Sequence, residues 1–442
     1  MKQLLYKTIK ELEDNQDIQI IDGDRGKNYP KKEEFKSTGF CVFLNANNIK
    51  DDSFVFDNVD FISEEKDNLL RKGKLSRNDI IITTRGTVGL VAYYGNNVPY
   101  DNIRINSGMI IIRTNGDIIN PNYFYQLLKS KILKKQYQLF ASGCAQPQLP
   151  IQDFRLINIP IFSKNHQDKI ANVLSNYDNL IENNNKRIKI LEEMAQKIYK
   201  EWFVNFKFPG HETANFKQTN LGTIPTDWDC KPIGELLKHK IGGGWGNEEK
   251  DQKYTESAYV IRGTDIPYGR EGNIQNCPLR YHTSSNIKTR LLQTNDIVFE
   301  VSGGSKGQPV GRALLLNKNL FNQFKDNVIC ASFCKLLRTD VEQILPELVY
   351  LHLLNIYNNG EIEKYQTQST GIINFKFTFF LESEQILVPN TDIQELFKKI
   401  AVPIFDEISL LGYKNQTLKQ TRDLILPRLI SGEIDVENMD IE

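Results

Sequence analysis

The sequence from residue 170 to residue 202 is IANVLSNYDNLIENNNKRIKILEEMAQKIYKEW. Apolar or aromatic residues recur at alternating steps of four and three, interrupted only by Asn184, which is the spacing of a narrow seam along one side of a helix. Residues 397–429 repeat this spacing, with Asn415 and Arg422 as the polar members of the seam. We therefore predict two long helices that pair with each other as a coiled coil.

The two asparagines indicate how the helices are paired. A seam asparagine is costly unless it meets a polar partner, so it tends to fix the register. In an antiparallel pair whose position numbers sum to 599, Asn184 faces Asn415, Trp202 faces Phe397, and both seams are used from end to end. A parallel pair could also match the asparagines, and each helix could instead pack on its own domain. We predict the antiparallel pair, with Asn184 and Asn415 setting its register.

Length and composition are those of an ordinary globular protein. The 442 residues suggest two to four domains, and 55 basic residues balance 55 acidic ones. Any nucleic-acid binding must therefore rest on local clusters of charge. Charged residues follow the N-terminus where a signal peptide would have a long apolar run, and no stretch approaches 18 consecutive apolar residues. We therefore expect a cytoplasmic protein with no membrane segment. The cysteines form no Cys-x-x-Cys pair and the five histidines are scattered, which favours reduced thiols and no metal site.

An internal repeat extends beyond the two helices. Residues 9–12 (IKEL) recur as 233–236 (IGEL), and residues 75–81 (LSRNDII) recur as 292–298 (LQTNDIV). Short β-rich runs come first in each half, and helical patches such as 121–137 and 346–357 follow. We predict an α+β fold with two tandem globular domains, each followed by a long helix, and a pseudo-twofold relation between the halves.

Glycine-containing loops with basic, amide or aromatic side chains are the candidates for DNA contact. Residues 22–32 suit a phosphate backbone, although a surface turn would look much the same. Residues 83–89 and 302–312 suit a groove, because arginine can contact guanine and glutamine can contact adenine in bidentate fashion; a solvated strand connection is the alternative. Trp245, which lies between glycines, could insert between bases, or it could instead pack at the edge of the hydrophobic core. The candidates are Arg25, Lys27, Lys31 and Lys32 for phosphate, Arg85, Lys306, Gln308 and Arg312 for the groove, and in addition Arg104, Trp245 and Arg262.

Motifs of enzymes are weak. The glycines at 242–246 lack the dinucleotide-binding spacing, and those at 303–307 lack the Gly-Lys-Ser/Thr end of a phosphate loop. Asn97-Val98-Pro99-Tyr100 differs by one residue from the Asn-Pro-Pro-Tyr motif of amino-methyltransferases, but it has no glycine-rich cofactor loop upstream. We therefore predict no catalytic residues and no metal site.

The centre of the chain resembles a known family. Residues 156–160 (LINIP), the spacing of Gln167, Ala171 and Asp178, residues 199–211 (YKEWFVNFKFPGH) and residues 222–228 (GTIPTDW) are similar to the central conserved region of the specificity subunits of type I restriction-modification systems. The tandem repeat agrees with this resemblance. One departure is that the first half lacks the Gly-x-Ile-Pro-x-x-Trp opening and begins near Leu4.

The resemblance implies a DNA-binding subunit that is not itself a catalyst. It implies two target recognition domains, each reading one half of a bipartite site, and helices that act as a spacer and dock two modification subunits. These subunits methylate adenine from S-adenosylmethionine, and restriction subunits that use ATP and Mg join later; this chain itself would bind no cofactor. The competing hypothesis is a scaffold whose coiled coil joins two protein-binding domains. The expected domains are 1–160 and 228–390 for recognition, 161–205 and 391–432 for the helices, 206–227 for the linker and 433–442 for the tail.

Overall fold

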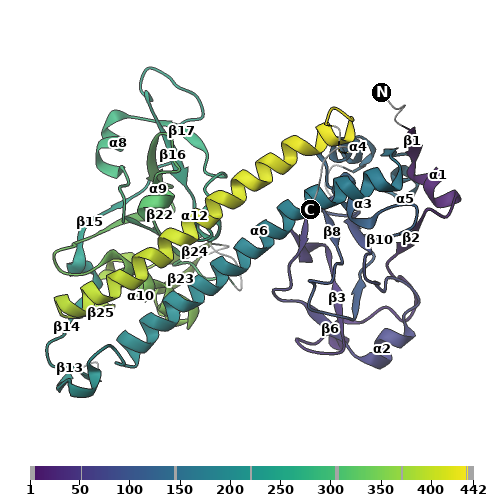
Figure 1. The fold of residues 1–442 in the computed structure, drawn as a ribbon. Helices are drawn as coiled ribbons and strands as arrows, with labels where there is room; N and C mark the ends of the chain where they lie inside the picture. The colour runs from purple at the N-terminus through teal and green to yellow at the C-terminus, as the bar shows by residue number, and fades with distance from the viewer. Residues whose placement is uncertain are drawn as a thin grey trace. The chain divides into compact units, whose positions relative to one another are not determined.

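The computed structural model describes residues 5–50, 52–143, 147–219, 222–303, 308–369, 372–434 and 436. The chain forms two compact units: the first comprises Met1–Asn179 together with Lys419–Glu442, and the second comprises Leu180–Leu418. Each unit therefore combines one globular part with one stretch of each long helix (Figure 1).

A four-stranded antiparallel sheet in the order β2-β10-β7-β8 forms the centre of the first unit. On the central strand, Ile111 lies opposite Ile21 of β2 and Ile81 of β7. Successive side chains point to opposite faces, so Ile110 packs into one apolar cluster and Ile111 into another. Burial of both faces explains the continuous isoleucine runs. The strands are β2 (Ile18–Asp22), β7 (Ile80–Thr83), β8 (Val91–Tyr93) and β10 (Met109–Thr114).

A smaller sheet in the order β6-β3-β9 accompanies the main sheet, with β3 parallel to β9 and antiparallel to β6. The predicted helical patch at 121–137 is two helices, because Ser130 caps a new helix by accepting a hydrogen bond from the Leu133 backbone. The other elements are β1 (Leu5–Thr8), which pairs with β11 (Asn158–Ile161), β3 (Cys41–Leu44), β4 (Ile49–Lys50), β5 (Ser53–Phe54), β6 (Asp60–Ile62), β9 (Ile103–Ile105), α1 (Ile9–Asp14), α2 (Glu64–Leu69), α3 (Pro121–Leu128), α4 (Lys131–Phe140) and α5 (Ile151–Phe154).

The second unit repeats this plan. Its main sheet has the order β15-β22-β18-β20, its smaller sheet has the order β17-β16-β21, and β14 pairs with β25 as β1 does with β11. In the smaller sheet β16 is parallel to β21, matching β3 and β9. The helices are α7 (Ile266–Arg270), α8 (Ser284–Arg290), α9 (Lys318–Phe321), α10 (Pro346–Asn358) and α11 (Phe377–Ser383). The strands are β12 (Phe216–Thr219), β13 (Gly222–Pro225), β14 (Asp229–Pro232), β15 (Leu237–Gly242), β16 (Glu256–Ile261), β17 (Leu279–His282), β18 (Ile297–Glu300), β19 (Ser302–Gly303), β20 (Ala313–Leu315), β21 (Asn327–Cys330), β22 (Cys334–Thr339), β23 (Gln366–Ser369), β24 (Ile372–Phe375) and β25 (Gln385–Val388).

One ion pair is repeated in the two main sheets. Arg113 on β10 donates to Asp79 at 2.7 Å, and Arg338 on β22 donates to Asp296 at 2.7 Å. Each aspartate is about 1% exposed and is preceded by an asparagine in the left-handed region, with φ of 73° and 69°. The repeated sequence LxxNDI is therefore a turn that aims a buried carboxylate at the neighbouring strand. The predicted tandem α+β fold is confirmed.

The two long helices are α6 (Lys164–Tyr199), continued by a π-helical turn (Lys200–Val204), and α12 (Thr391–Ile430). Within the second unit, Asn184 Nδ2 donates to Asn415 Oδ1 at 2.8 Å, and Trp202 and Phe397 have ring centroids 5.8 Å apart. In the first unit, Ile170 and Leu429 belong to one apolar cluster. These contacts confirm the predicted antiparallel pairing.

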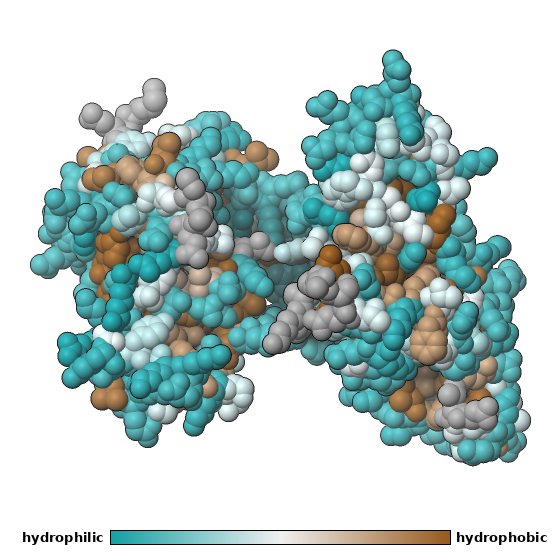
Figure 2. All heavy atoms as spheres, turned by 180° about the vertical axis from the view of Figure 1, so that it is seen from behind, coloured by the Kyte–Doolittle hydropathy of each residue, from teal (hydrophilic) through white to brown (hydrophobic). Residues whose placement is uncertain are grey.

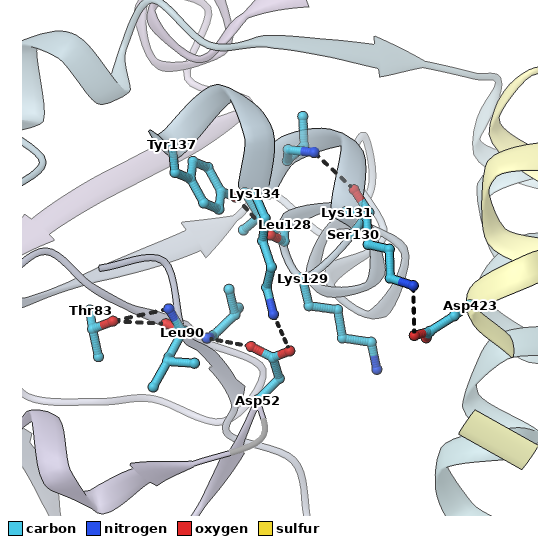
Figure 3. Close-up of polar contacts among 12 residues, drawn as sticks. Asp52, Thr83, Leu90, Leu128, Lys129, Ser130, Lys131, Lys134, Tyr137 and Asp423 are labelled. Atoms are coloured by element: carbon cyan, nitrogen blue, oxygen red, sulfur yellow. Dashed lines mark hydrogen bonds and ion pairs between the residues drawn. The ribbon is translucent and has the colours of Figure 1, made fainter. Parts of the chain in front are cut away.

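Charged side chains attach the first globular part to its helix segments. Asp178 on α6 accepts from Lys129 at 2.7 Å and from Arg422 on α12 at 2.6 Å. Burial alone would raise the pKa of Asp178. The two cations lower it by a larger amount, so the pKa of Asp178 lies below its usual value. Figure 3 shows the neighbouring contacts of α4, where Lys134 bonds to Asp52 and Lys131 extends toward Asp423 on α12.

Close backbone approach attaches the second globular part to α12. Gly412 lies so near the turn after α7 that a Cβ there would be 2.1 Å from Glu271 O and 2.6 Å from Gly272 Cα. Amide side chains complete this contact: Asn317 donates to Phe405 O at 2.6 Å, and Gln416 donates to Gly272 O at 3.1 Å.

Hydrophilic residues cover most of the face shown in Figure 2, and hydrophobic residues form separate patches on each unit. Among the helices of the described residues, none has the length and apolar character that a membrane crossing requires.

Candidate nucleic-acid interface

Loops from four parts of the first unit meet at one edge of its main sheet. Thr84 and Arg85, which follow β7, both donate their backbone N–H to Gly108 O in the β9–β10 turn, at 2.8 and 3.2 Å. Gly23, after β2, packs so closely on this turn that a Cβ would lie 2.2 Å from Asn106 O. Gln148 forms backbone bridges with Arg85 and with Ser142. We call this group of residues the loop cluster of the first unit: 23–25, 84–86, 106–108, 142 and 147–149.

The second unit builds the same arrangement. Val301 after β18 donates its N–H to Phe333 O in the β21–β22 turn at 2.9 Å, as Thr84 does to Gly108 O. Gly243 after β15 packs on that turn, with a would-be Cβ 2.1 Å from Cys330 O. The loop cluster of the second unit comprises 243–245, 301–303, 331–333 and the strands β23 and β24.

The hydrogen bonds align the two clusters residue by residue. Leu149 N donates to Thr84 O, and Phe375 N donates to Val301 O, both at 2.9 Å. Arg85 therefore corresponds to Ser302, which is paired with Asn374 as Arg85 is paired with Gln148. By their distance from the packed glycine, Arg25 corresponds to Trp245.

Side chains of several clustered residues are exposed to solvent. In the first unit they are those of Arg25, Arg85, Ser142 and Gln148. In the second unit they are those of Thr367 and Asn374, together with Trp245 at 42% and Phe333 at 59% exposed. An aromatic ring exposed to this degree in a tight turn contributes little to the core, so packing does not account for Phe333.

Three predicted DNA-contact residues thus lie in the loop clusters: Arg25, Arg85 and Trp245. Arg25 also donates to Ser107 O at 3.3 Å and pairs with Asp22, while the Arg280 guanidinium lies 5.0 Å from the Trp245 ring centroid. Gln308 is exposed, and Lys306 lies outside the described residues.

Burial removes two other residues from the candidate set. Arg104 is 5% exposed and uses its guanidinium on Asp67 and on backbone carbonyls, including Lys72 O at 2.7 Å. Arg312 is 9% exposed and forms a two-point pair with Glu300 at 2.8 and 2.5 Å. Both arginines stabilise the fold and present no guanidinium for bidentate contact with a base.

Arg262 is partly exposed but committed to a local turn. It pairs with Asp265 at 2.8 Å and donates to Asn276 O at 2.8 Å. Its geometry therefore makes it a weaker candidate than Arg85.

The predicted phosphate-contact residues Lys27, Lys31 and Lys32 are exposed on the loop after β2. Asp24 ties this loop to a second basic segment by accepting N–H groups from Gly26 and Arg71, each at 2.7 Å. Burial alone would raise the pKa of Asp24. The backbone hydrogen bonds lower it by a larger amount, so the pKa of Asp24 lies below its usual value. Sequence reasoning missed the exposed residues of this second segment, Arg71 and Lys72.

The tetrapeptide from Asn97 to Tyr100 is part of a structural loop. Arg77 donates to the carbonyls of Gly95, Val98 and Tyr100, and the ring of Tyr100 contacts Phe56 and Phe61. Across the described ranges, no group of three or more His, Cys, Asp and Glu side chains could hold a metal ion.

The outer surface of the two helices carries both charged and apolar residues. Lys186, Lys189, Glu193, Lys197 and Lys200 are exposed, whereas Glu192 is half-buried. Burial raises the pKa of Glu192 to about 7, with Arg270 acting against this shift. Exposed apolar residues of α6 and α12 in the second unit are Leu180, Ile190, Met194, Leu396, Ile400, Leu410 and Tyr413.

Comparisons with known proteins agree with this architecture. The family model of the type I restriction modification DNA specificity domain matches residues 10–193. The MjaIX specificity subunit of Methanocaldococcus jannaschii is 26% identical over 379 residues, which cover 81% of this chain and 78% of that protein. The HindI specificity subunit of Haemophilus influenzae is 21% identical over 481 residues, which cover 93% and 98%.

The fold is also found in a solved structure. The crystal structure of the type I restriction-modification S subunit from M. genitalium matches with a TM-score of 0.53 at 14% identity and covers 97% of each chain. In its sequence over most of its length and in its repeated fold, the chain is therefore similar to the specificity subunits of type I restriction-modification systems.

Proposed function

We propose that the chain is the specificity subunit of a type I restriction-modification system. In this role each unit reads one half of a bipartite DNA site, while the long helices set the spacing and dock two modification subunits. The observation that carries this proposal is the repeated loop cluster, built from corresponding hydrogen bonds in both units. A pair of half-sites in a duplex requires two readers of the same construction. Different exposed side chains on one framework suit two different half-sites.

The framework itself argues for DNA as the ligand. Exposed cations on the two segments joined by Asp24 suit phosphate oxygens, which position a protein on a duplex without reading its sequence. Arginine, glutamine and asparagine in the loop clusters suit base edges. Because the whole chain has zero net charge, we expect partner subunits to add cationic surface to the complex with DNA.

The exposed apolar residues of α6 and α12 suit the docking of a partner protein. Apolar residues are enriched at the centres of interfaces, and the flanking lysines and glutamates suit a polar rim. We expect the adenine methyltransferase chemistry, with S-adenosylmethionine, to reside in the modification subunits, and ATP and Mg to be used by the restriction subunits. The cytoplasmic location also stays a prediction.

The test is purified chain with S-adenosylmethionine and a DNA library that holds every short sequence, with and without the modification subunit. We expect methyl transfer only in the complex, at adenines within one bipartite sequence. Methyl transfer by the lone chain would return attention to Asn97 and Tyr100. Sequence-independent methylation by the complex would contradict the proposed reading of half-sites.

Docking has its own test. Replacing Ile190 and Met194 by aspartate should prevent co-purification with the modification subunit without lowering the thermal stability of the chain. Lys186→Ala is the matched control on the same helix, because its salt bridge with Glu182 is local and exposed. Equal co-purification of all three proteins would exclude this apolar surface as the docking site.

The spacer role is tested by helix length. A heptad added to both helices lengthens each by roughly 10 Å, which is about 3 base pairs of duplex. We expect the mapped site to keep its two half-sites and to gain about 3 base pairs between them. An unchanged spacer would show that the helices do not set the distance.

A further inference from the structure

The loop clusters differ in chemistry although they share their backbone hydrogen bonds. In the first unit the exposed positions carry Arg25, Arg85 and Gln148. In the second unit the corresponding positions carry Trp245, Ser302 and Asn374, and Phe333 replaces Gly108 in the turn. The first cluster is thus cationic and rich in donors, and the second is aromatic with an amide.

These two chemistries suit different base pairs. Guanine presents the O6 and N7 acceptors that a bidentate arginine contacts, and adenine presents the N7 acceptor and N6 donor that an amide contacts. Thymine presents a methyl group in the major groove, and apolar side chains recognise it by direct contact. A serine at the position of Arg85 leaves the second cluster without a bidentate donor for guanine there.

We infer that the loop clusters are the base-reading surfaces and that the two units read different kinds of half-site. Arg85 of the first unit contacts a guanine, with Gln148 beside it to contact adenine. Phe333 of the second unit contacts a thymine methyl group, with Asn374 on adenine and Trp245 at the flank. This inference rests on the proposed function and specifies which residues carry it.

The position of Phe333 supports this role. Its carbonyl accepts from Val301 N, so the backbone of the turn is held by the main sheet while the ring is 59% exposed. Arg85 is held in the same way, because its N–H donates to Gly108 O and its neighbour Gly86 donates to Pro147 O at 3.2 Å. A fixed backbone with a free side chain is what sequence discrimination requires, since a mobile loop would lose part of the contact energy to ordering.

The experiment uses the full chain in complex with its modification subunit, first to map the wild-type site and then to measure binding to duplexes with single-atom changes. At each guanine of the mapped site, 7-deazaguanine removes N7, and at each thymine, uracil removes the methyl group. We expect the wild-type complex to lose about 5-fold or more in affinity at one guanine of one half-site and at one thymine of the other.

The variants then assign the contacts. Arg85→Ala should abolish the sensitivity to 7-deazaguanine at its guanine and leave the other half-site unchanged. Phe333→Ala should abolish the sensitivity to uracil at its thymine. Because each sensitivity is a difference between two duplexes bound by the same variant, a general loss of stability does not imitate the result.

Matched controls lie at the far ends of the same sheets. Lys10 is exposed on α1, which precedes β2, whereas the loop cluster follows β2. Val341 is 62% exposed beyond the end of β22 that is opposite Phe333. Lys10→Ala and Val341→Ala should retain both sensitivities.

The outcomes separate this inference from the proposed function. A bipartite site at which Arg85→Ala and Phe333→Ala keep the wild-type sensitivities would overturn the assignment of the loop clusters and leave the specificity-subunit function intact. The same holds if neither half-site contains the expected guanine or thymine. A complex that binds and methylates without sequence preference would instead overturn the proposed function.

Discussion

Each unit shares an apolar core with its helix segments, but the first unit adds a partly buried ionic contact and the second adds close backbone packing. Asp178 joins Lys129 and Arg422 in the first unit, and Gly412 meets Gly272 in the second. The main sheets of the two units are nevertheless alike, and each contains the same Asp–Arg pair. The sheet framework therefore tolerates different attachments, and the attachments give the two units different sensitivities to pH and to side-chain volume.

The largest effect is expected for Gly412→Val. Alanine or valine would be a better helix former than glycine by up to about 1 kcal/mol, but a Cβ would lie 2.1 Å from Glu271 O. We expect the second unit to lose about 3 kcal/mol in its free energy of unfolding. Hydrogen exchange, resolved by unit, should show the loss in the second unit, with Leu424→Ala on the exposed side of α12 as the control. Unchanged protection in the second unit would mean that the close approach is not needed.

A smaller effect is expected for Asp178→Asn in the first unit. Removing this carboxylate leaves Lys129 and Arg422 without their shared partner, which should cost about 2 to 3 kcal/mol at neutral pH. Burial also lowers the pKa of Lys129 to about 8 against the effect of Asp178.

The pH dependence of that effect has a definite sign. The folded-state pKa of Asp178 lies below its unfolded value, which is about 3.9. Its stabilisation is therefore fully present above that value and is lost as pH falls through the folded-state pKa. Urea unfolding between pH 7 and pH 3 should show wild type and Asp178→Asn converging at the acidic end. A constant difference across this range would rule out the ionic account.

Matched substitutions test the likeness of the two sheets. Asp79→Ala and Asp296→Ala each strand an arginine and an N–H group, of Ser76 and Gln293 respectively, bonded at 2.7 Å in both units. We expect about 2 kcal/mol from each substitution, and the two values should agree within about 0.5 kcal/mol. Calorimetry of each variant measures its loss in free energy of unfolding. Clearly unequal losses would show that the Asp–Arg pair contributes differently to stability in the two units.

The smallest effect in free energy is expected at the paired asparagines. Replacing Asn184 and Asn415 by leucine removes two buried amides and should stabilise the helix pair by about 1 kcal/mol, but loosen its register. A cysteine crosslink between positions 188 and 411 measures the register. If the crosslink forms as efficiently and as uniquely in the leucine variant, the asparagines do not set the register.

The sequence was most informative where spacing alone carries the signal. Seam periodicity and one polar pair were enough to predict that Asn184 faces Asn415, and the recurrence of LxxNDI helped to predict two related α+β domains. Both features depend on neighbours at fixed intervals along the chain. Their geometry follows from the periods of helices and strands.

The loops were less predictable, because a sequence does not show whether a charge is paired. Arg312 was expected in a groove, yet Glu300 lies twelve residues before it and both are buried. Arg104 finds its carboxylate in Asp67, thirty-seven residues away. Phe333 was missed for the opposite reason, since a lone phenylalanine between short strands is usually part of a core. Only the alignment of backbone hydrogen bonds shows that Phe333 of the second unit corresponds to Gly108 of the first.

The end of α12 belongs to the unit that is synthesised first. Leu426, Leu429 and Val436 are buried in the same apolar cluster as Ile170 and Leu174. On the ribosome, the first unit must therefore wait, with part of its core uncovered, until more than two hundred further residues have been translated. Premature termination after residue 418 would leave the second unit with all of its residues and harm the first. The C-terminal part of α12 is thus needed to complete the core of the N-terminal half.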